Sequence, residues 1–221
     1  MQLKVTENLF RARDPWSALT HFIAFLAAIP AMPILLLRAV SQGGSIPALL
    51  SLSIFTVSMM LLYGASTAYH AFQLSPSGNR FLKKLDHIMI FYLIAGSYTP
   101  ICIIALGGAV GRNLLILVWM LAAAGTVFAL CWVTCPKWVS SVIYIAMGWS
   151  CLTAMKNVLA SLPSVSSLWL FLGGIAYTLG GVIYALKPKK LQQKAFGTHE
   201  IFHVFVMIGS LFHYICMYHI L

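Results

Sequence analysis

Seven long apolar stretches, separated by short polar breaks, limit what this chain can fold into. A helix that crosses a membrane needs about 20 apolar residues, because each residue adds about 1.5 Å across a hydrocarbon core about 30 Å thick. The stretches are placed at residues 16–38, 46–72, 85–106, 113–133, 138–155, 167–186 and 199–221. The sequence therefore predicts an all-α, polytopic membrane protein with seven transmembrane helices in residues 16–221, preceded by a cytoplasmic N-terminal segment, residues 1–15.

The composition agrees with a chain that is surrounded by lipid. Of the 221 residues, 61% are apolar and 8% are charged, whereas ordinary soluble domains have about a quarter of their residues charged. The net charge of +10 comes from short basic clusters between apolar runs, as expected for loops at an anionic lipid surface. No aromatic-basic module of the nucleic-acid-binding kinds is present. The five cysteines are odd in number and mostly lie in apolar stretches, so we expect neither a nucleic-acid partner nor a disulfide framework.

Basic residues predict the orientation of the helices, because lysine and arginine favour cytoplasmic loops. One set of alternate breaks and ends contains only Arg38, Arg112 and Lys156, whereas the other contains eleven basic residues. The larger set is Lys4, Arg11, Arg13, Arg80, Lys83, Lys84, Lys137, Lys187, Lys189, Lys190 and Lys194. We therefore expect the N-terminus in the cytoplasm and the C-terminus outside. The first sixteen residues lack the features of a cleavable signal peptide, so we expect the first apolar stretch to remain as a span.

Five polar side chains in or beside the apolar stretches are candidates for a functional site, because ionisable groups are costly in a bilayer. His199 and His203 are four residues apart and therefore share one helix face. Ser66 and His70 have the same spacing at the end of the second stretch, and Asp86 lies at the start of the third. In the predicted topology, these positions all lie near the cytoplasmic surface. We therefore expect the five side chains to converge at one depth.

Three neutral imidazoles at one depth suit a zinc ion that keeps a fourth position for water. We expect His70, His199 and His203 to bind Zn2+. Beside such an ion, Asp86 would orient and deprotonate the water, and Ser66 would hydrogen-bond a ligand or substrate oxygen. A lone histidine near a helix end is more often an interfacial residue, so the prediction depends on all three histidines meeting.

Other histidines have weaker claims on this site. His21 opens the first stretch on the same side and is either a partner of the metal ligands or an interfacial residue. His87 adjoins Asp86 but projects about 100° away around the helix, so an interfacial or packing role is expected. His213 lies about 15 Å beyond His203 along the helix axis and cannot reach the same ion.

Three blocks of the sequence resemble the signature blocks of the haemolysin III family, which belongs to the progestin and adipoQ receptor superfamily of seven-span proteins. The blocks are residues 66–70, residues 85–88 with 94–100, and residues 199–206. The resemblance covers nearly the whole chain and implies a zinc ion on His70, His199 and His203. It also implies that Ser66 and Asp86 lie near that ion, and it favours a resident protein of the bacterial inner membrane.

One block before the first span departs from the family pattern. Family members often show a Glu, an Asn and a Thr-His pair there, where this chain has Asp14, Ser17, Thr20 and His21. The histidine is kept, but the shorter aspartate and the serine leave the role of this block open.

The loops are too short to contain a soluble domain, so the helices themselves must provide any functional site. Three classes of function fit these features. The first is a metal-dependent hydrolase that cleaves an amide or ester of a membrane lipid, in which Asp86 handles protons and Ser66 helps to hold the oxyanion. The second is a non-catalytic regulator of membrane homeostasis, or a lipid-sensing receptor-like protein, whose zinc fastens the second and seventh helices together. The third is a cytolytic haemolysin, which ranks lowest because a seven-span chain without a secretion signal is typical of a resident membrane protein. A lipid substrate or ligand within the helix bundle is the expected partner.

Overall fold

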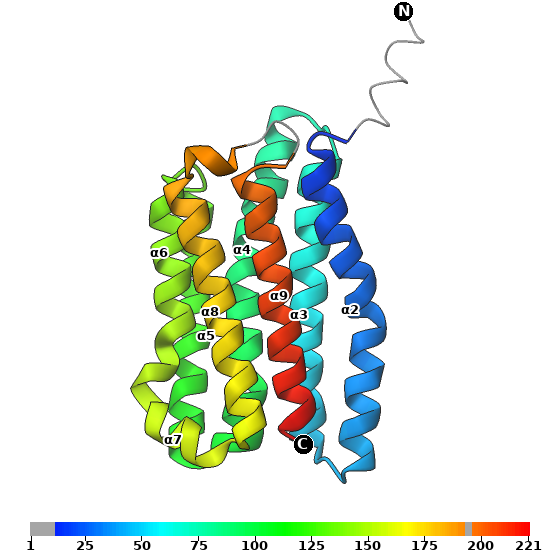
Figure 1. The fold of residues 1–221 in the computed structure, drawn as a ribbon, viewed down its shortest axis with the longest axis vertical. Helices are drawn as coiled ribbons and strands as arrows, with labels where there is room; N and C mark the ends of the chain where they lie inside the picture. The colour runs from blue at the N-terminus through cyan, green and yellow to red at the C-terminus, as the bar shows by residue number, and fades with distance from the viewer. Residues whose placement is uncertain (1–11, 193–195) are drawn as a thin grey trace, which may run out of the picture.

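The structure, a computed structural model, describes residues 12–192 and 196–221. In this part of the chain, seven helices are long and apolar enough to cross a membrane. They stand side by side in one bundle, with the connecting loops at its two ends (Figure 1). The described residues contain no strand, so the predicted all-α, seven-span fold is confirmed.

The spans follow the predicted stretches, and two of them are composite. The third continues into a π-helix, and the fifth joins two α-helices through a 3-10 segment. In chain order the elements are α2 (Pro15–Ser41), α3 (Ile46–Ala71), α4 (Pro76–Pro100) with η1 (Ile101–Leu106), α5 (Gly108–Cys131), α6 (Lys137–Gly148) with η2 (Trp149–Ala154) and α7 (Met155–Ser161), α8 (Ser164–Leu186), η3 (Lys189–Leu191) and α9 (Thr198–His219).

The third span begins earlier than its apolar stretch predicts. Ser75 caps α4, because its side-chain oxygen accepts the backbone N–H of Gly78 at 3.3 Å, and Pro76 occupies the first helical turn. A polar first turn can lie outside the lipid, so the helix is longer than its apolar part. The prediction that Asp86 starts this helix is therefore wrong: Asp86 lies about three turns into α4.

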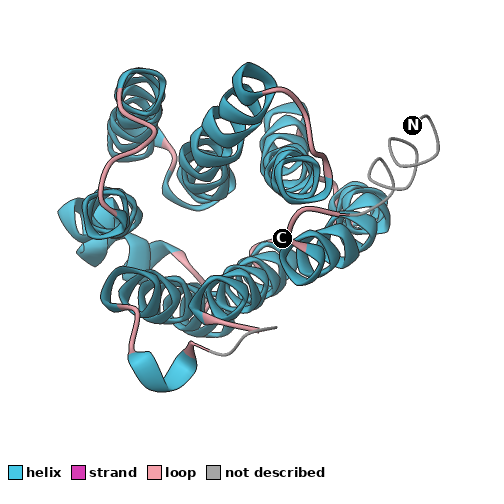
Figure 2. Ribbon diagram, turned by 90° about the horizontal axis from the view of Figure 1, so that it is seen from above, coloured by secondary structure: helices cyan, strands magenta, loops and turns pink. Residues whose placement is uncertain are grey.

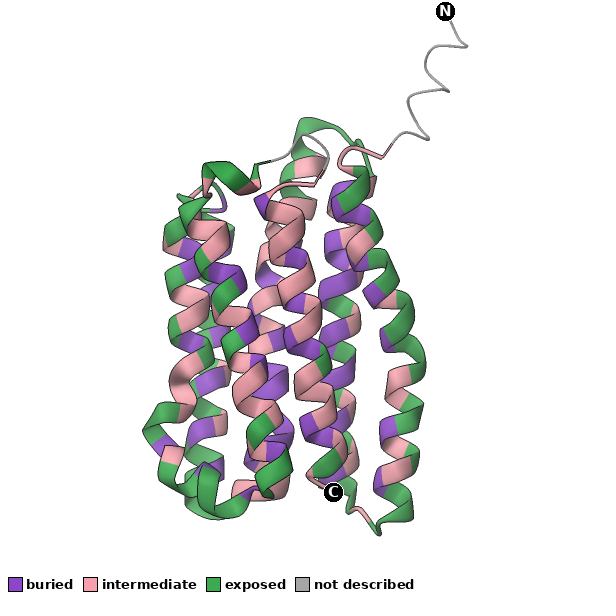
Figure 3. Cartoon of the chain, in the orientation of Figure 1, coloured by how far each residue is buried: buried purple, intermediate pink, exposed green. Residues whose placement is uncertain are grey.

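Lipid-facing surface covers the outside of the bundle. Leu37 is 69% exposed, Met120 is 66% exposed and Val127 is 60% exposed. Figure 3 shows that exposed positions recur along the outer side of α2, while buried ones face the neighbouring helices. Apolar side chains exposed in this way over seven spans mark a surface that lies against lipid rather than water.

Close helix contacts shape the interior. α2 packs along α3 and α9, α8 packs along α9, and α6 packs against α8 and α4. The end-on view shows the helices side by side, nearly parallel to one another (Figure 2). A side chain at Gly173 would collide with the His213 ring, and one at Gly180 would collide with Phe205. Glycines therefore let α8 approach α9 closely, as small residues do in membrane helix packing.

The five cysteines, all within the described residues, are free thiols, as the composition predicted.

Within the described residues, the two predicted sets of basic residues lie at opposite ends of the bundle. Arg13 precedes α2 and Lys187 follows α8, whereas Arg38 lies at the other end of α2. Lys4, Arg11 and Lys194 fall outside the described residues. So do residues 1–11 of the predicted N-terminal segment, residues 1–15. Which end faces the cytoplasm stays a prediction from the charge bias.

Candidate metal centre

Three histidines meet at the end of the bundle where α2 begins. The end of α3 and the start of α9 lie there (Figure 1). His70 is the last residue but one of α3, while His199 and His203 lie one turn apart in the first two turns of α9. One ligand nitrogen from each ring lies within 4.8 Å of the others. His70 and His203 are buried and His199 is half-buried. The structure thus brings together the three imidazoles that the sequence predicted to meet.

The spacing of the ring nitrogens fits a single metal ion. The Nε2 atoms of His70 and His199 are 3.1 Å apart, and two nitrogens bound tetrahedrally to zinc are about 3.4 Å apart. The three ring pairs have centroids 4.9, 5.2 and 4.4 Å apart and are inclined by 54°, 69° and 58°. Rings inclined in this way, rather than stacked flat, can aim one nitrogen each at a common point.

The other nitrogens of two of these rings contact α2 and the residue before it. His70 Nδ1 lies 3.0 Å from Asp14 Oδ2, and the backbone N–H of Asp14 donates to the His70 carbonyl at 2.9 Å. His203 Nδ1 lies 3.2 Å from Thr20 Oγ1. Partial burial raises the pKa of Asp14, but hydrogen bonds from His70 and Arg13 outweigh it and hold that pKa below its ordinary value.

The first turns of α2 also contact the helix that contains two of the three histidines. Ser17 Oγ donates to Glu200 Oε1 at 2.5 Å. Glu200 Oε2 accepts a hydrogen bond from the Gly197 N–H at 2.8 Å and thereby caps the N-terminus of α9. His21 is buried and its ring stacks on His203 with centroids 3.7 Å apart and an 11° tilt. Of the two readings of His21, the structure favours a partner of the histidines over an interfacial residue.

Asp86 reaches the same region from α4. It is buried, and it lines a cavity together with His199, His203 and His21. Its Oδ2 lies 3.6 Å from Nδ1 of His87. His87 also lines the cavity, so of the two roles expected for it the structure favours packing over an interfacial position. Adjacent residues project about 100° apart around a helix, and both of these side chains border the cavity.

Ser66 lies one turn before His70 on α3 and is fully buried. Its hydroxyl makes no hydrogen bond to any residue that the structure describes, and Ser66 is not among the residues that line the cavity. The structure therefore places Ser66 next to the histidine cluster along the helix. It shows no contact between this hydroxyl and the other candidates.

The cavity extends from the histidine cluster into the middle of the bundle. Its volume is about 120 Å³, and α4, α6, α8 and α9 provide most of its walls. Trp149, Tyr98 and His213 lie at the far part, where a smaller cavity of about 40 Å³ shares these three residues. Most of the lining is apolar, which suits an acyl chain more than a water-soluble ligand.

Comparison with known proteins identifies the family to which the chain belongs. The family described as haemolysin-III related matches residues 11–214. The chain belongs to this family. It is 37% identical to the "Hemolysin-3 homolog" of Bacillus subtilis over 91% of each chain, and 35% identical to "Hemolysin-3" of Bacillus cereus over 91% of this chain and 88% of the relative. It is also 27% identical to the human "Monocyte to macrophage differentiation factor" over 73% of this chain and 66% of that protein. Family membership and the seven spans together identify a multi-pass integral membrane protein.

Sequence reasoning missed the contacts that surround the histidine cluster in this haemolysin-III related protein. It left the roles of Asp14, Ser17 and His21 open, and it named Glu200 only within a signature block. A signal was present, because residues 14, 17 and 21 have the i, i+3, i+7 spacing of one helix face. Polar residues on one face at the start of an apolar helix indicate a buried polar contact.

Proposed function

We propose that this haemolysin-III related protein is a zinc-dependent hydrolase that cleaves an amide or ester bond of a membrane lipid. The observation that carries the proposal is one cavity with two chemically different ends. Two of the three clustered histidines and Asp86 line one end, and mostly apolar side chains line the rest. A lipid that places its carbonyl group at the histidines and its chain along the apolar walls fits this division.

Three neutral imidazoles suit a zinc ion, which when bound would supply Lewis acidity and lower the pKa of bound water to about 7. The Asp86 carboxylate accepts a proton from the water that attacks the carbonyl carbon, and returns it to the nitrogen or oxygen that departs as the C–N or C–O bond breaks. The Ser66 hydroxyl has no hydrogen-bond partner among the described residues, but Ser66 does not line the cavity, so we assign it no contact with the substrate. The apolar walls hold the chain and exclude bulk water.

A structural role for the metal is the second candidate, and the contacts between helices favour it. The histidine cluster joins α3 to α9, and Ser17 and Glu200 join α2 to α9 at the same end. A metal that only fastened these helices would suit a regulator of membrane homeostasis or a lipid sensor. For either role we propose membrane lipids as the partners and the bacterial inner membrane as the location, since two of the relatives come from Bacillus species.

Purified variants distinguish the two roles. We expect His70→Ala, His199→Ala and His203→Ala each to lose bound zinc, whereas Asp86→Asn keeps zinc and loses hydrolysis of a lipid extract by at least about 100-fold. Metal analysis and mass spectrometry of the released fatty acids measure both properties. His219→Ala is the matched control, because this exposed histidine lies at the opposite end of α9.

The outcomes separate clearly. Full zinc retention in all three ligand variants would contradict the metal centre. Normal turnover in Asp86→Asn would remove the proton role of this carboxylate alone. Zinc loss in the ligand variants, together with no lipid cleaved by the unmodified protein, would favour the structural role.

A further inference from the structure

We propose that Asp14 and Thr20 are positioning residues that hold His70 and His203 in the tautomer required for metal binding. In this tautomer Nδ1 bears the proton and Nε2 presents its lone pair to the ion. The inference depends on the metal centre of the proposed function and is independent of hydrolysis. It gives the start of α2, which supplies none of the three ligands, control over how tightly the metal is bound.

The contact of His70 fixes its tautomer. An ionised carboxylate has no proton to donate, so the 3.0 Å contact between Asp14 Oδ2 and His70 Nδ1 requires the proton on Nδ1. A neutral imidazole has only one N–H, so Nε2 then has a free lone pair. The same Nε2 is the atom 3.1 Å from His199 Nε2, where the ligand nitrogens converge. The backbone bond from Asp14 to the His70 carbonyl holds the carboxylate in place.

The contact of His203 gives the same result by a different route. A threonine hydroxyl can donate or accept, so a 3.2 Å contact with Nδ1 does not assign the proton by itself. The Thr20 hydroxyl, however, donates its single hydrogen to the Ser17 carbonyl at 2.9 Å. Only its lone pairs remain for His203, so Nδ1 is the donor and Nε2 is free for the metal.

The third ligand lacks this support. His199 Nδ1 is buried and has no hydrogen-bond partner among the described residues. Two of the three rings are therefore oriented from the start of α2 and one is not. Partners that orient a metal-binding histidine typically contribute about 10-fold to 100-fold to metal affinity, so loss of either one should be measurable.

The test is zinc affinity of the full chain in detergent, measured by competition with a chromophoric chelator. We expect Asp14→Ala and Thr20→Val each to bind zinc about 10-fold to 100-fold more weakly. Asp14→Asn and Thr20→Ser keep an acceptor oxygen and should recover most of the affinity. The visible absorption of bound Co2+ provides a second readout, because its tetrahedral bands should broaden and weaken in the first pair of variants only.

Ser17→Ala is the matched control for the docking of α2. It removes the bond to Glu200 but keeps the Ser17 carbonyl that Thr20 uses, and the Ser17 side chain has no hydrogen bond to a ligand ring. We expect its zinc affinity to stay within about threefold of the unmodified protein. An equal loss in Ser17→Ala and Asp14→Ala would overturn the proposal, because helix docking would then explain both.

Two further results have separate meanings. Unchanged affinity in both Asp14→Ala and Thr20→Val would overturn the positioning role while leaving the metal centre intact. No zinc binding by the unmodified protein would instead contradict the proposed metal centre, and with it this inference. The conservative variants keep the test valid if an alanine or valine variant does not fold.

Discussion

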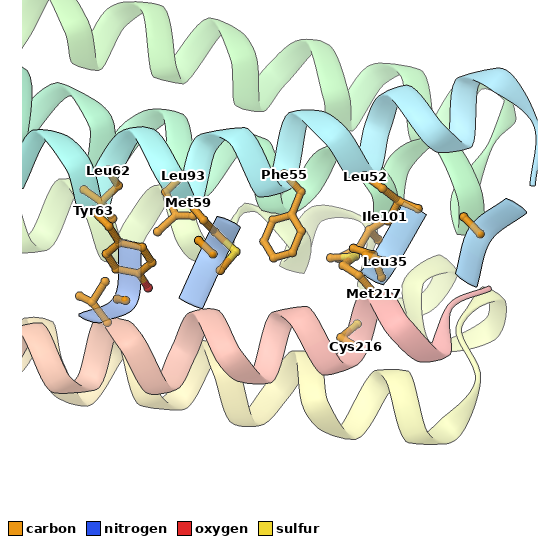
Figure 4. Packing of buried hydrophobic residues seen from close by; sticks show 14 residues of the cluster. Leu35, Leu52, Phe55, Met59, Leu62, Tyr63, Leu93, Ile101, Cys216 and Met217 are labelled. Carbon is orange, nitrogen blue, oxygen red and sulfur yellow. The ribbon is translucent and has the colours of Figure 1, made fainter. Parts of the chain in front are cut away.

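The two ends of the α2, α3 and α9 group are built from the same helices by different means. At one end, Asp14, Thr20 and Ser17 reach His70, His203 and Glu200 through hydrogen bonds. At the other, Leu35, Leu52 and Met217 belong to a buried apolar cluster with Ile101 of η1 (Figure 4). We call these regions the polar end and the apolar end. The apolar end needs only matching shapes, whereas the polar end needs particular atoms at particular distances.

This difference separates stability from function within one set of helices. In a bilayer, helix association depends on packing and on interhelical hydrogen bonds, because lipid tails are as apolar as leucine. Fully buried side chains at the apolar end therefore contribute to stability when their volume fills the space between the helices. The polar end places ionisable groups in a costly environment, and the proposed metal centre would use three of them. Substitutions at the two ends should consequently have different effects.

The largest expected effect on stability is at the apolar end. Leu52 is fully buried in α3, so Leu52→Ala should lower the free energy of unfolding by about 2–5 kcal/mol, through lost contacts and the remaining cavity. Zinc affinity should not change. Chemical denaturation in mixed micelles measures the first quantity and chelator competition the second.

Leu50→Ala is the control for this substitution, because Leu50 is 60% exposed on the same helix. It should be nearly neutral for both quantities. A large loss of zinc affinity in Leu52→Ala would show that the two ends do not act separately.

The effect of zinc removal on stability is expected to be the next largest, and it should be confined to the polar end. At a free zinc concentration 100 times the dissociation constant, binding stabilises the folded chain by about 2.7 kcal/mol. Stripping the metal should therefore increase backbone hydrogen exchange in residues 14–21 and in the first turns of α9, and leave the apolar end unchanged. Mass spectrometry of exchanged fragments measures both regions. Equal increases along the whole of α2 would contradict the separation.

The seven spans could be predicted because lipid requires long apolar stretches, and the histidine cluster because His199 and His203 share a face at the same end as His70. The start of α4 could not be predicted in this way, because its polar first turns lie outside the apolar pattern. Nor could the contact between Asp14 and His70. It depends on how α2 is rotated and shifted against α3, and the apolar pattern leaves that rotation undetermined.

A smaller effect is expected where α2 meets α9 at the polar end. Ser17→Ala removes a 2.5 Å hydrogen bond to the Glu200 carboxylate, and hydrogen bonds to charged groups contribute about 1.5–3 kcal/mol. The free energy of unfolding should fall by that amount, measured by the same denaturation. Ser53→Ala is the control, because the Ser53 hydroxyl bonds only within its own helix, to the Leu49 carbonyl. A loss of similar size in Ser53→Ala would show that the contact between α2 and α9 is not responsible.

The smallest effect is expected from a polar contact between α2 and α9 at the apolar end. Arg38 Nε donates to the Tyr218 carbonyl at 2.9 Å, and the guanidinium lies 4.1 Å above the Tyr218 ring. Arg38→Gln should lower the free energy of unfolding by about 0.5–1 kcal/mol, because each such contact contributes little where water can reach it. Zinc affinity should be unaffected, since Arg38 and Asp14 are at opposite ends of α2. If zinc affinity fell with Arg38→Gln, α2 would be acting as a rigid rod that transmits a change at one end to the ligands at the other.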